Sequence, residues 1–332
     1  MNMLKIQSLG IRMIRKKILI AGGAGYIGTR FCNQNVNKYD ITVVDNFMFG
    51  DFIDERVTKV KKDIKDLTIN DVKGYDAVLF LAGLSNDPMA MYRPDLNFIE
   101  NSAAPTYLAF ITKEAGVKRF ICASSASVYG FTKNKTLTEL SKVKPAYAYG
   151  ISKLQCERGI TILEDDNFKP ILFRKGTVGG WCNKMRFDLV VNTMLMTAFT
   201  KKKIIVNSPK LWRPLIDIRD VIHAYETAIE ADEHLSGIYN ISGGNYTIGQ
   251  LGQIIYDDLL ERGFPISLEY KDVKDFRNYK MSTSKAEDEL QFTARYTPED
   301  SVKEILDNIS LDTFDFTNEI YYNINTFKRI LK

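Results

Sequence analysis

A serine cluster and a tyrosine–lysine pair are the residues whose types and spacing first suggest chemistry in this chain. The serines lie in ASSASVYG (123–130), and Tyr149 and Lys153 lie in AYAYGISKL (146–154). Residues four positions apart share one face of a helix, so a helix here would place the phenol beside the ammonium. A tyrosine can act as a general acid or base when its environment supports both protonation states. The pair therefore predicts a proton-transfer site next to the serines.

The same spacing of tyrosine and lysine occurs again at Tyr129 and at Tyr270, so spacing alone does not select Tyr149. Context does, because Tyr149 opens a predicted helix that follows a buried strand ending in the serine cluster. Within that cluster Ser125 is the expected active hydroxyl, and Ser124 and Ser127 remain alternatives.

A glycine-rich segment, GGAGYIG (22–28), follows the first predicted strand and opens the first predicted helix. Gly22, Gly25 and Gly28 are spaced so that the chain can turn tightly, approach a pyrophosphate with its backbone and pack the helix close to the sheet. The N-terminus of the helix adds partial positive charge for the phosphates. The segment therefore predicts a dinucleotide-binding loop.

Asp45 ends the next predicted strand, 20 residues after Gly25. A carboxylate at this point can hydrogen-bond the hydroxyls of the adenosine ribose, and it would repel a 2′-phosphate. The sequence therefore predicts NAD rather than NADP as the cofactor.

Strand-like and helix-like segments alternate through the first part of the chain, which is typical of βαβ units and a parallel, doubly wound sheet. The predicted strands are 17–21, 41–45, 57–60, 77–82, 119–123 and 170–174, and the predicted helices are 26–35, 105–115 and 152–165. The predicted fold class is therefore α/β with a Rossmann-type sheet.

After about residue 177 the alternation loosens. Helices are expected at 186–200, 221–231, 248–262 and 299–309, and short strands at 204–206, 215–218, 238–241 and 266–270. We expect residues 13–177 to bind the dinucleotide, with a contribution from about 214–242. Residues 178–332 are expected to form a smaller mixed α/β domain for the substrate. A cleft between two such parts is a favoured place for a ligand.

Composition argues against several other classes of protein. The 332 residues include 45 Lys and Arg and 41 Asp and Glu, and the net charge of +4 is too small to predict nucleic-acid binding. The four cysteines form no Cys-x-x-Cys pair and there are only two histidines, so no metal site is predicted. No apolar run reaches the ~20 residues of a membrane span. We expect a cytoplasmic protein with reduced thiols.

In combination, these motifs resemble the extended short-chain dehydrogenases/reductases, specifically their branch of NAD-dependent nucleotide-sugar epimerases and dehydratases. The resemblance covers most of the chain. It is carried, in order, by GGAGYIG, VVDN, KDI, LAGLSNDP, Asn101, ASSASVYG, YGISKLQCE, FRKGTVGG, MRFDLVVN, WRPLIDIRDV and FRNYKMSTSK. Several motifs in one order are far more specific than any single motif.

The resemblance implies a role for each motif. Tyr149 would take a proton from a sugar hydroxyl while a hydride moves from the same carbon to the nicotinamide. Lys153 would stabilise the phenolate and hold the nicotinamide ribose, and Ser125 would hydrogen-bond the reacting oxygen. The residues expected to bind NAD are Gly22, Gly25, Tyr26, Ile27, Gly28, Asp45, Asn46, Asp63, Ile64, Leu81, Ala82, Gly83, Asn101, Tyr149 and Lys153.

A nucleoside-diphosphate sugar would bring a diphosphate, for which arginines are suited partners. The residues expected to bind the substrate are Ser85, Ser125, Arg186, Asn192, Arg213 and Arg277. Common 4-epimerases have a Tyr-Gly-x-Pro segment where this chain has 178–181, and many have a basic residue in place of Ser85. Both departures argue against a standard hexose as the sugar.

The residues after the active serine separate the reactions of this family. Sugar 4,6-dehydratases usually carry an Asp–Glu pair there, whereas this chain has Ala126 and Ser127. Serine, tyrosine, lysine and NAD suffice for reversible oxidation at C4 of the sugar. The resemblance therefore favours a nucleotide-sugar 4-epimerase. A 4-dehydrogenase or 4-ketoreductase is the alternative, and a 4,6-dehydratase or a non-catalytic NAD-binding regulator is less favoured.

A homodimer is also expected. The apolar helices around 108–115 and 151–162 resemble those through which relatives pair in a four-helix bundle, although the same apolar stripes could belong to the core.

Overall fold

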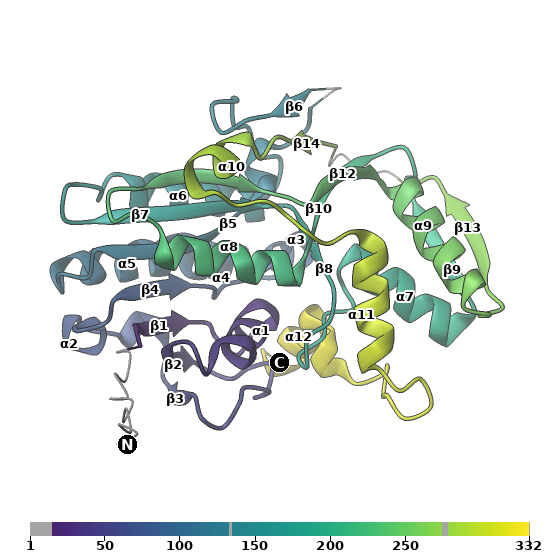
Figure 1. Ribbon diagram of the computed structural model, residues 1–332, viewed down its shortest axis with the longest axis horizontal. Coiled ribbons are helices and arrows are strands. Elements are labelled where there is room, and N and C mark those ends of the chain that lie inside the picture. Colours follow the sequence, from purple (N-terminus) through teal and green to yellow (C-terminus); the bar gives the residue numbers. More distant parts are fainter. Residues whose placement is uncertain (1–14, 133–134, 274–277, 332) are drawn as a thin grey trace, which may run out of the picture.

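The computed structural model of the protein describes residues 15–132, 135–273 and 278–331 (Figure 1). Seven of its strands are β1 Lys17–Ala21, β2 Asp40–Asp45, β3 Thr58–Lys61, β4 Ala77–Phe80, β5 Arg119–Ser125, β7 Lys169–Lys175 and β11 Gly237–Ile241. They form one parallel sheet in the order β11-β7-β5-β4-β1-β2-β3. The strand order changes direction between β1 and β4, which opens a crevice at the carboxyl ends of the strands.

Helices cover both faces of this sheet (Figure 1). They are α1 Tyr26–Asn35 and α8 Ile218–Glu230 on one face, and α5 Ala104–Glu114 and α6 Ala148–Thr161 on the other. Alternate residues of β1 serve the two faces: Ile18 and Ile20 pack with α1 and α8, and Leu19 and Ala21 pack with α5 and α6. A strand covered on both sides must be apolar where it is covered, which explains the run ILIA at 18–21. The predicted α/β fold with a Rossmann-type sheet is confirmed.

The remaining elements are short or lie beyond the large sheet. The helices are α2 Ile69–Val72, α3 Asp87–Tyr92, α4 Pro94–Phe98, α7 Val190–Lys201, α9 Ile248–Glu261, α10 Ser284–Leu290, α11 Pro298–Asn308 and α12 Asn323–Ile330. The strands are β6 Thr136–Leu137, β8 Thr177–Gly179, β9 Lys203–Asn207, β10 Trp212–Asp217, β12 Gly244–Thr247, β13 Ser267–Lys271 and β14 Lys280–Met281. They form three small sheets, β12-β10-β8, β13-β9 and β14-β6.

The chain leaves the large sheet after β7 and returns to it through α8 and β11. It then builds the outer part of the molecule with α9 and β13, seen on the right of Figure 1. The last helix, α12, comes back to pack against α3, where Phe327 joins Leu84 and Met89 in a small buried cluster. This return of the C-terminus was not predicted.

Two of the differences between predicted and observed helix bounds affect the site. The helix predicted at 186–200 begins only at Val190, because Leu189 has an extended backbone and Asp188 is held in an ion pair with Arg186. The helix predicted at 152–165 begins at Ala148, so Tyr149 lies in its first turn.

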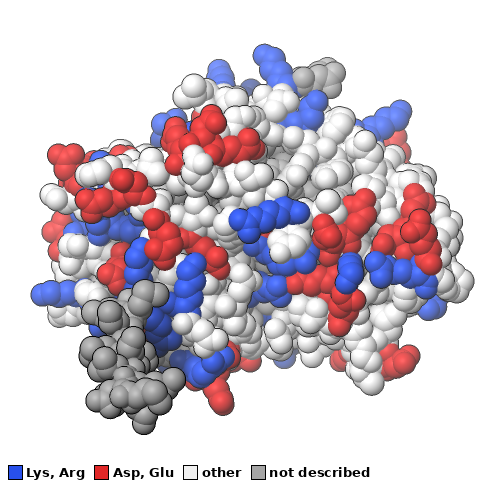
Figure 2. Space-filling model, in the orientation of Figure 1, with Lys and Arg blue, Asp and Glu red and all other residues white. Residues whose placement is uncertain are grey.

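Charges of both signs are interspersed over the face of the molecule shown in Figure 2. Within the described ranges, no helix is both long enough and apolar enough to cross a bilayer.

Candidate active site

A cavity of about 650 Å³ lies at the carboxyl ends of the parallel strands. The predicted site residues that line it are Gly22, Gly25, Tyr26, Ile27, Gly28, Asp45, Asn46, Asp63, Ile64, Leu81, Ala82, Gly83, Ser85, Asn101, Ser125, Tyr149, Lys153, Arg186 and Arg213. Asn192 does not line it, and Arg277 lies outside the described residues. The structure thus gathers the two motif groups, which are about a hundred residues apart in sequence, around one space.

Two glycines of the loop, Gly22 and Gly28, are closely packed, whereas the third, Gly25, faces open space. Gly22 has a φ of +84°, and a Cβ on it would lie 2.4 Å from the Cα of Ala82. A Cβ on Gly28 would lie 2.4 Å from the carbonyl oxygen of Gly23. A Cβ on Gly25 would approach only the carbonyl oxygen of Gly22, at 3.7 Å. The space above Gly25 is therefore left for a ligand.

Asp45 is fixed at the end of β2 by the backbone of two neighbouring loops. Its carboxylate accepts hydrogen bonds from the N–H of Ala24 at 2.9 Å and from the N–H of Phe47 at 2.8 Å. Burial raises the pKa of this carboxyl, and the two N–H groups partly oppose that effect. A carboxylate has about four acceptor positions, so it can still accept bonds from two ribose hydroxyls.

Tyr149, Lys153 and Ser125 lie on one side of the cavity. Lys153 is buried, and its Nζ donates to the carbonyl oxygen of Ala123 at 3.0 Å and lies 6.0 Å from the centre of the Tyr149 ring. Ser125 ends β5, and its Oγ accepts hydrogen bonds from the N–H and the Oγ of Ser127, at 3.2 and 2.9 Å. The O–H of Ser125 is therefore left to donate to a ligand.

Ser124, one of the two alternatives to Ser125, faces the other side of the sheet. Its Oγ donates to Glu157 at 2.5 Å, and Glu157 forms a buried ion pair with Arg174 at 2.7 Å. Although Ser124 contacts the cavity, its hydroxyl already donates to Glu157, and that of Ser127 donates to Ser125, so Ser125 is the serine suited to donate to a reacting oxygen.

Lys175 is a cavity residue that sequence reasoning missed. It ends β7 directly opposite Ser125 in the sheet, and its Nζ lies 3.3 Å from both the carbonyl oxygen of Ser124 and the hydroxyl of Tyr225. Burial, together with the nearby charge of Lys153, lowers the pKa of Lys175 to about 7. The only sequence signal was a lysine at the end of an otherwise apolar strand.

Asn101 presents an unused acceptor at the cavity wall. Its Nδ2 donates to the carbonyl oxygen of Leu84 and to Asn97, both at 2.8 Å, whereas its buried Oδ1 has no hydrogen-bond partner among the described residues. Asn101 lies in a π-helical turn, 99–103, between α4 and α5. Pro105 accounts for the turn, because it has no N–H to donate to Asn101 and its ring crowds that carbonyl.

These features fit a dinucleotide. The loop is open above Gly25, Asp45 holds a carboxylate at the ribose end, and Asn101 keeps a free acceptor beside Gly83. Tyr149 and Lys153 lie on the wall of the same cavity, where a nicotinamide and a substrate would meet.

One residue predicted to bind the substrate, Asn192, lies behind the wall of the cavity. Asn192 is completely buried, and its Nδ2 donates to the hydroxyl of Tyr26 at 3.3 Å and to the carbonyl oxygen of Arg186 at 3.1 Å, while its Oδ1 accepts from Gly180. Because both N–H bonds of its amide are donated inside the protein, Asn192 holds the Arg186 loop against the glycine loop, and it does not line the cavity. Arg213 lines the cavity from β10, with its guanidinium 5.7 Å from the centre of the Tyr279 ring.

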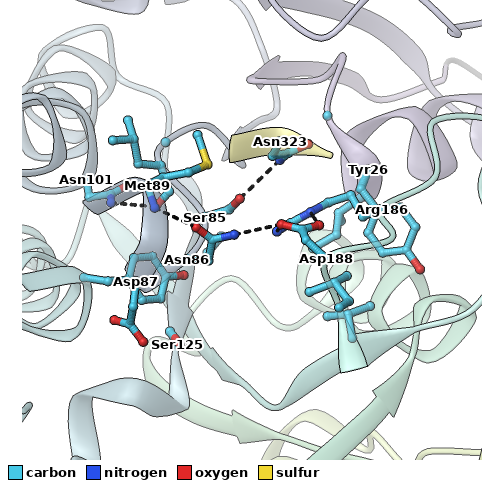
Figure 3. Close-up of a pocket in the computed structure, with 18 of the residues that line it drawn as sticks. Tyr26, Ser85, Asn86, Asp87, Met89, Asn101, Ser125, Arg186, Asp188 and Asn323 are labelled. Atoms are coloured by element: carbon cyan, nitrogen blue, oxygen red, sulfur yellow. Dashed lines mark hydrogen bonds and ion pairs between the residues drawn. The ribbon is translucent and has the colours of Figure 1, made fainter. Parts of the chain in front are cut away.

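The C-terminal helix α12 completes the wall of the cavity. Asn323 and Phe327 of this helix contact it, as does Leu331 directly after the helix. Asn323 donates to Ser85 at 3.4 Å (Figure 3) and accepts from the buried Lys184 at 3.1 Å. The signal that could have found this helix is the helical spacing of apolar residues through 324–331.

Known proteins share this fold. A UDP-glucose 4-epimerase 3 of Oryza sativa subsp. japonica is 26% identical over 327 residues, covering 86% of this chain and 88% of that protein. The solved UDP-N-acetylglucosamine 4-epimerase of Methanobrevibacter ruminantium M1, in complex with UDP-N-acetylmuramic acid, has a TM-score of 0.80 at 22% identity and covers 90% of this chain and all of its own. The UDP-glucuronic acid 4-epimerase of Bacillus cereus, with UDP-glucuronic acid and NAD, has a TM-score of 0.78 at 20% identity, over 88% and 98%.

The sequence profile of the NAD dependent epimerase/dehydratase family matches residues 18–242. This range runs from β1 to the end of β11 and therefore includes the complete parallel sheet, the glycine loop and the Tyr149–Lys153 pair. The predicted family and its NAD dependence are confirmed: this chain is a member of the NAD dependent epimerase/dehydratase family.

Proposed function

We propose that the protein is a nucleotide-sugar 4-epimerase, which inverts C4 of a sugar by oxidation and reduction. The observation that carries this proposal is the position of Tyr149, Lys153 and Ser125 in one cavity with the glycine loop. The relatives compared above, which are 4-epimerases of three different UDP-sugars, support it.

Each residue has a distinct task in this proposal. NAD, when bound, supplies the acceptor and donor of the C4 hydride. Tyr149 takes the proton of the C4 hydroxyl and later returns it. Lys153 has used one N–H on Ala123, and its other N–H groups can stabilise the phenolate and hold a ribose hydroxyl. Ser125 donates its O–H to the C4 oxygen.

The residues after Ser125 argue against dehydration. Ala126 is buried and has no ionisable group, and the hydroxyl of Ser127 donates a hydrogen bond to Ser125. Neither can remove a proton from C5 or protonate a leaving hydroxyl, which argues against a 4,6-dehydratase that uses an Asp–Glu pair at these two positions.

A panel of UDP-, GDP-, CDP- and dTDP-sugars tests the proposal. An epimerase converts one sugar into its C4 epimer, as seen by NMR, with no lasting rise in the reduced-nicotinamide absorbance. Net formation of reduced cofactor with a 4-keto product would instead identify a dehydrogenase. No turnover of any sugar by NAD-loaded protein would contradict both activities.

We also propose a homodimer formed through α5 and α6. Tyr107, Phe110 and Ile151 are exposed on these two helices, and Ile162, directly after α6, is 82% exposed. Burying such side chains against a second copy is favourable. Light scattering should give twice the mass of one chain, and the variant with Phe110 and Ile162 both changed to Lys should give a single-chain mass.

The assignment of residue ranges to cofactor and substrate binding is also a proposal. We propose that residues 13–177, with 214–242, bind the cofactor and that 178–332 bind the substrate. The return of the chain to the large sheet at β11 supports the first part of this assignment. A cytoplasmic location is proposed from the four free, buried cysteines and would be tested by fractionation of cells.

A further inference from the structure

An ion pair on the substrate side of the cavity has a geometry that bears on the choice of sugar. Arg186 and Asp188 precede α7, and the guanidinium donates from Nε at 2.9 Å and from Nη2 at 2.7 Å to the two carboxylate oxygens. Asn86, at the start of α3, donates to the same carboxylate at 2.8 Å from the opposite wall (Figure 3). The carboxylate of Asp188 therefore has three donors.

Both members of the pair are charged and well shielded from water. Burial alone would raise the pKa of Asp188, but the adjacent Arg186 outweighs this effect and holds the pKa below its usual value. Their side chains are only 14% and 9% exposed, respectively. A two-pronged pair of opposite charges has almost no net charge, so the guanidinium is not available as a counter-ion for another anion.

The pair lies near the reacting end of the site. Arg186 and Asp188 line the same cavity as Tyr149. Figure 3 shows Arg186 and Asp188 across the cavity from Ser125. A sugar whose C4 oxygen meets Tyr149 carries its nearest substituents on C3 and C5, and the C6 group on C5 can extend across the cavity toward this pair.

One nitrogen of Arg186 remains available. The two hydrogen bonds of the guanidinium to Asp188 come from Nε and Nη2. Nη1 makes no hydrogen bond within the described part of the chain. This nitrogen can donate to a neutral oxygen such as a hydroxyl. A carboxylate in the same position would gain that bond but would face the negative charge of Asp188, which is unfavourable in a water-poor site.

We propose that Asp188 is a specificity-determining residue that makes the site select sugars with an uncharged C6 group and reject uronic acids. This inference rests on the proposed function and names the sugar class that it acts on. Asp188 neutralises Arg186, Asn86 keeps the carboxylate in place, and the free Nη1 recognises a hydroxyl. Discrimination by a built-in repulsive group is a general route to specificity, and here that group is a carboxylate.

The test compares sugars that differ only at C6, namely UDP-glucose with UDP-glucuronate and GDP-mannose with GDP-mannuronate. We measure binding by calorimetry and kcat/KM with NAD-loaded protein. For wild type we expect a preference for the neutral sugar of at least about a hundredfold. Asp188→Asn removes the negative charge and frees Arg186, so the preference should fall at least about tenfold, mainly through a lower KM for the uronate.

Matched variants separate charge from structure. Asp188→Glu keeps the charge and should keep the preference, whereas Asp188→Asn combined with Arg186→Gln should lose the gained affinity for the uronate. Asn86→Ala serves as the second variant if Asp188→Asn proves unstable. It removes one hydrogen bond to Asp188 and leaves the ion pair intact, so it should give a preference between those of wild type and Asp188→Asn.

Two results would overturn the inference: equal use of both sugars by wild type, or an unchanged preference in a folded Asp188→Asn variant. Either result leaves the proposed function standing, because a sugar is still bound and epimerised. If the wild type turns over no sugar of the wider panel of UDP-, GDP-, CDP- and dTDP-sugars, the proposed function itself fails.

Discussion

Lys175 lies directly opposite Ser125 in the pairing of β7 with β5, and its Nζ is 3.3 Å from the carbonyl oxygen of Ser124. Lys153 donates to the preceding carbonyl, that of Ala123. Two buried lysines therefore bind consecutive carbonyls at the end of the strand that carries the active serine. The second ammonium makes this strand end more positive than a single lysine would.

The first prediction concerns the effect of Lys175 on stability. Its folded pKa, about 7, is below the ~10.4 of an unfolded lysine. Between these values the unfolded chain binds more protons, so this group makes the free energy of unfolding rise with pH, and the cost of burying the charge is greatest below about pH 7. Lys175→Met should therefore raise the melting temperature more at about pH 6 than at about pH 10.

Lys303→Met is the matched control, because Lys303 is exposed on α11. It should change the melting temperature by similar small amounts at both pH values. An equal gain at both pH values for Lys175→Met would show that packing, and not the buried charge, dominates at this position.

The second prediction concerns the proposed acid–base group. Tyr149→Phe removes the phenolic O–H, so turnover should fall by at least about a hundredfold while NAD binding is retained. Tyr147→Phe, two residues away, is the control and should retain most of the activity. Unchanged kinetics in Tyr149→Phe would place the proton transfer on another group.

The third prediction concerns the ribose end of the cofactor. Asp45→Ala removes the acceptor for two ribose hydroxyls, so the affinity for NAD should fall about tenfold or more, and the affinity for NADP should fall less. Binding titrations with both cofactors provide the measurement. A wild-type preference for NADP would contradict this account of Asp45.

The fourth prediction concerns α12. Phe327 is buried against Leu84 and Met89 and also lines the cavity, so Phe327→Ala should lower the free energy of unfolding by about 3 kcal/mol and speed the release of NAD. Ile330→Ala on the same helix is the control, because Ile330 is 46% exposed. Equal release rates in the two variants would show that the helix does not help to retain NAD.

The parts of the site that end a strand or open a helix could be predicted from sequence. Gly22 follows β1, Asp45 ends β2 and Tyr149 lies in the first turn of α6. The topology of a parallel sheet brings the carboxyl ends of its strands together whatever their separation in sequence. Local pattern and topology were therefore sufficient to predict both the fold and the gathering of these residues.

The parts that depend on long-range packing could not be predicted. Nothing near Asn192 shows that its amide is used by Tyr26 and Gly180, since those partners come from other segments. The burial of Lys175 depends on Tyr225 of α8, fifty residues further along the chain. Asn323 reaches the cavity only because the C-terminus folds back onto α3. In each case a distant segment determines the role of the side chain.

The late arrival of β11 has a consequence for how the chain can be divided and made. β7 pairs with β5 on one side and with β11 on the other. β11 begins at Gly237, sixty-two residues after the end of β7 at Lys175. A fragment that stopped before β11 would leave β7 as an open edge that invites pairing with other chains. During synthesis the N-terminal half therefore cannot become a finished, aggregation-resistant unit until most of the polypeptide has left the ribosome.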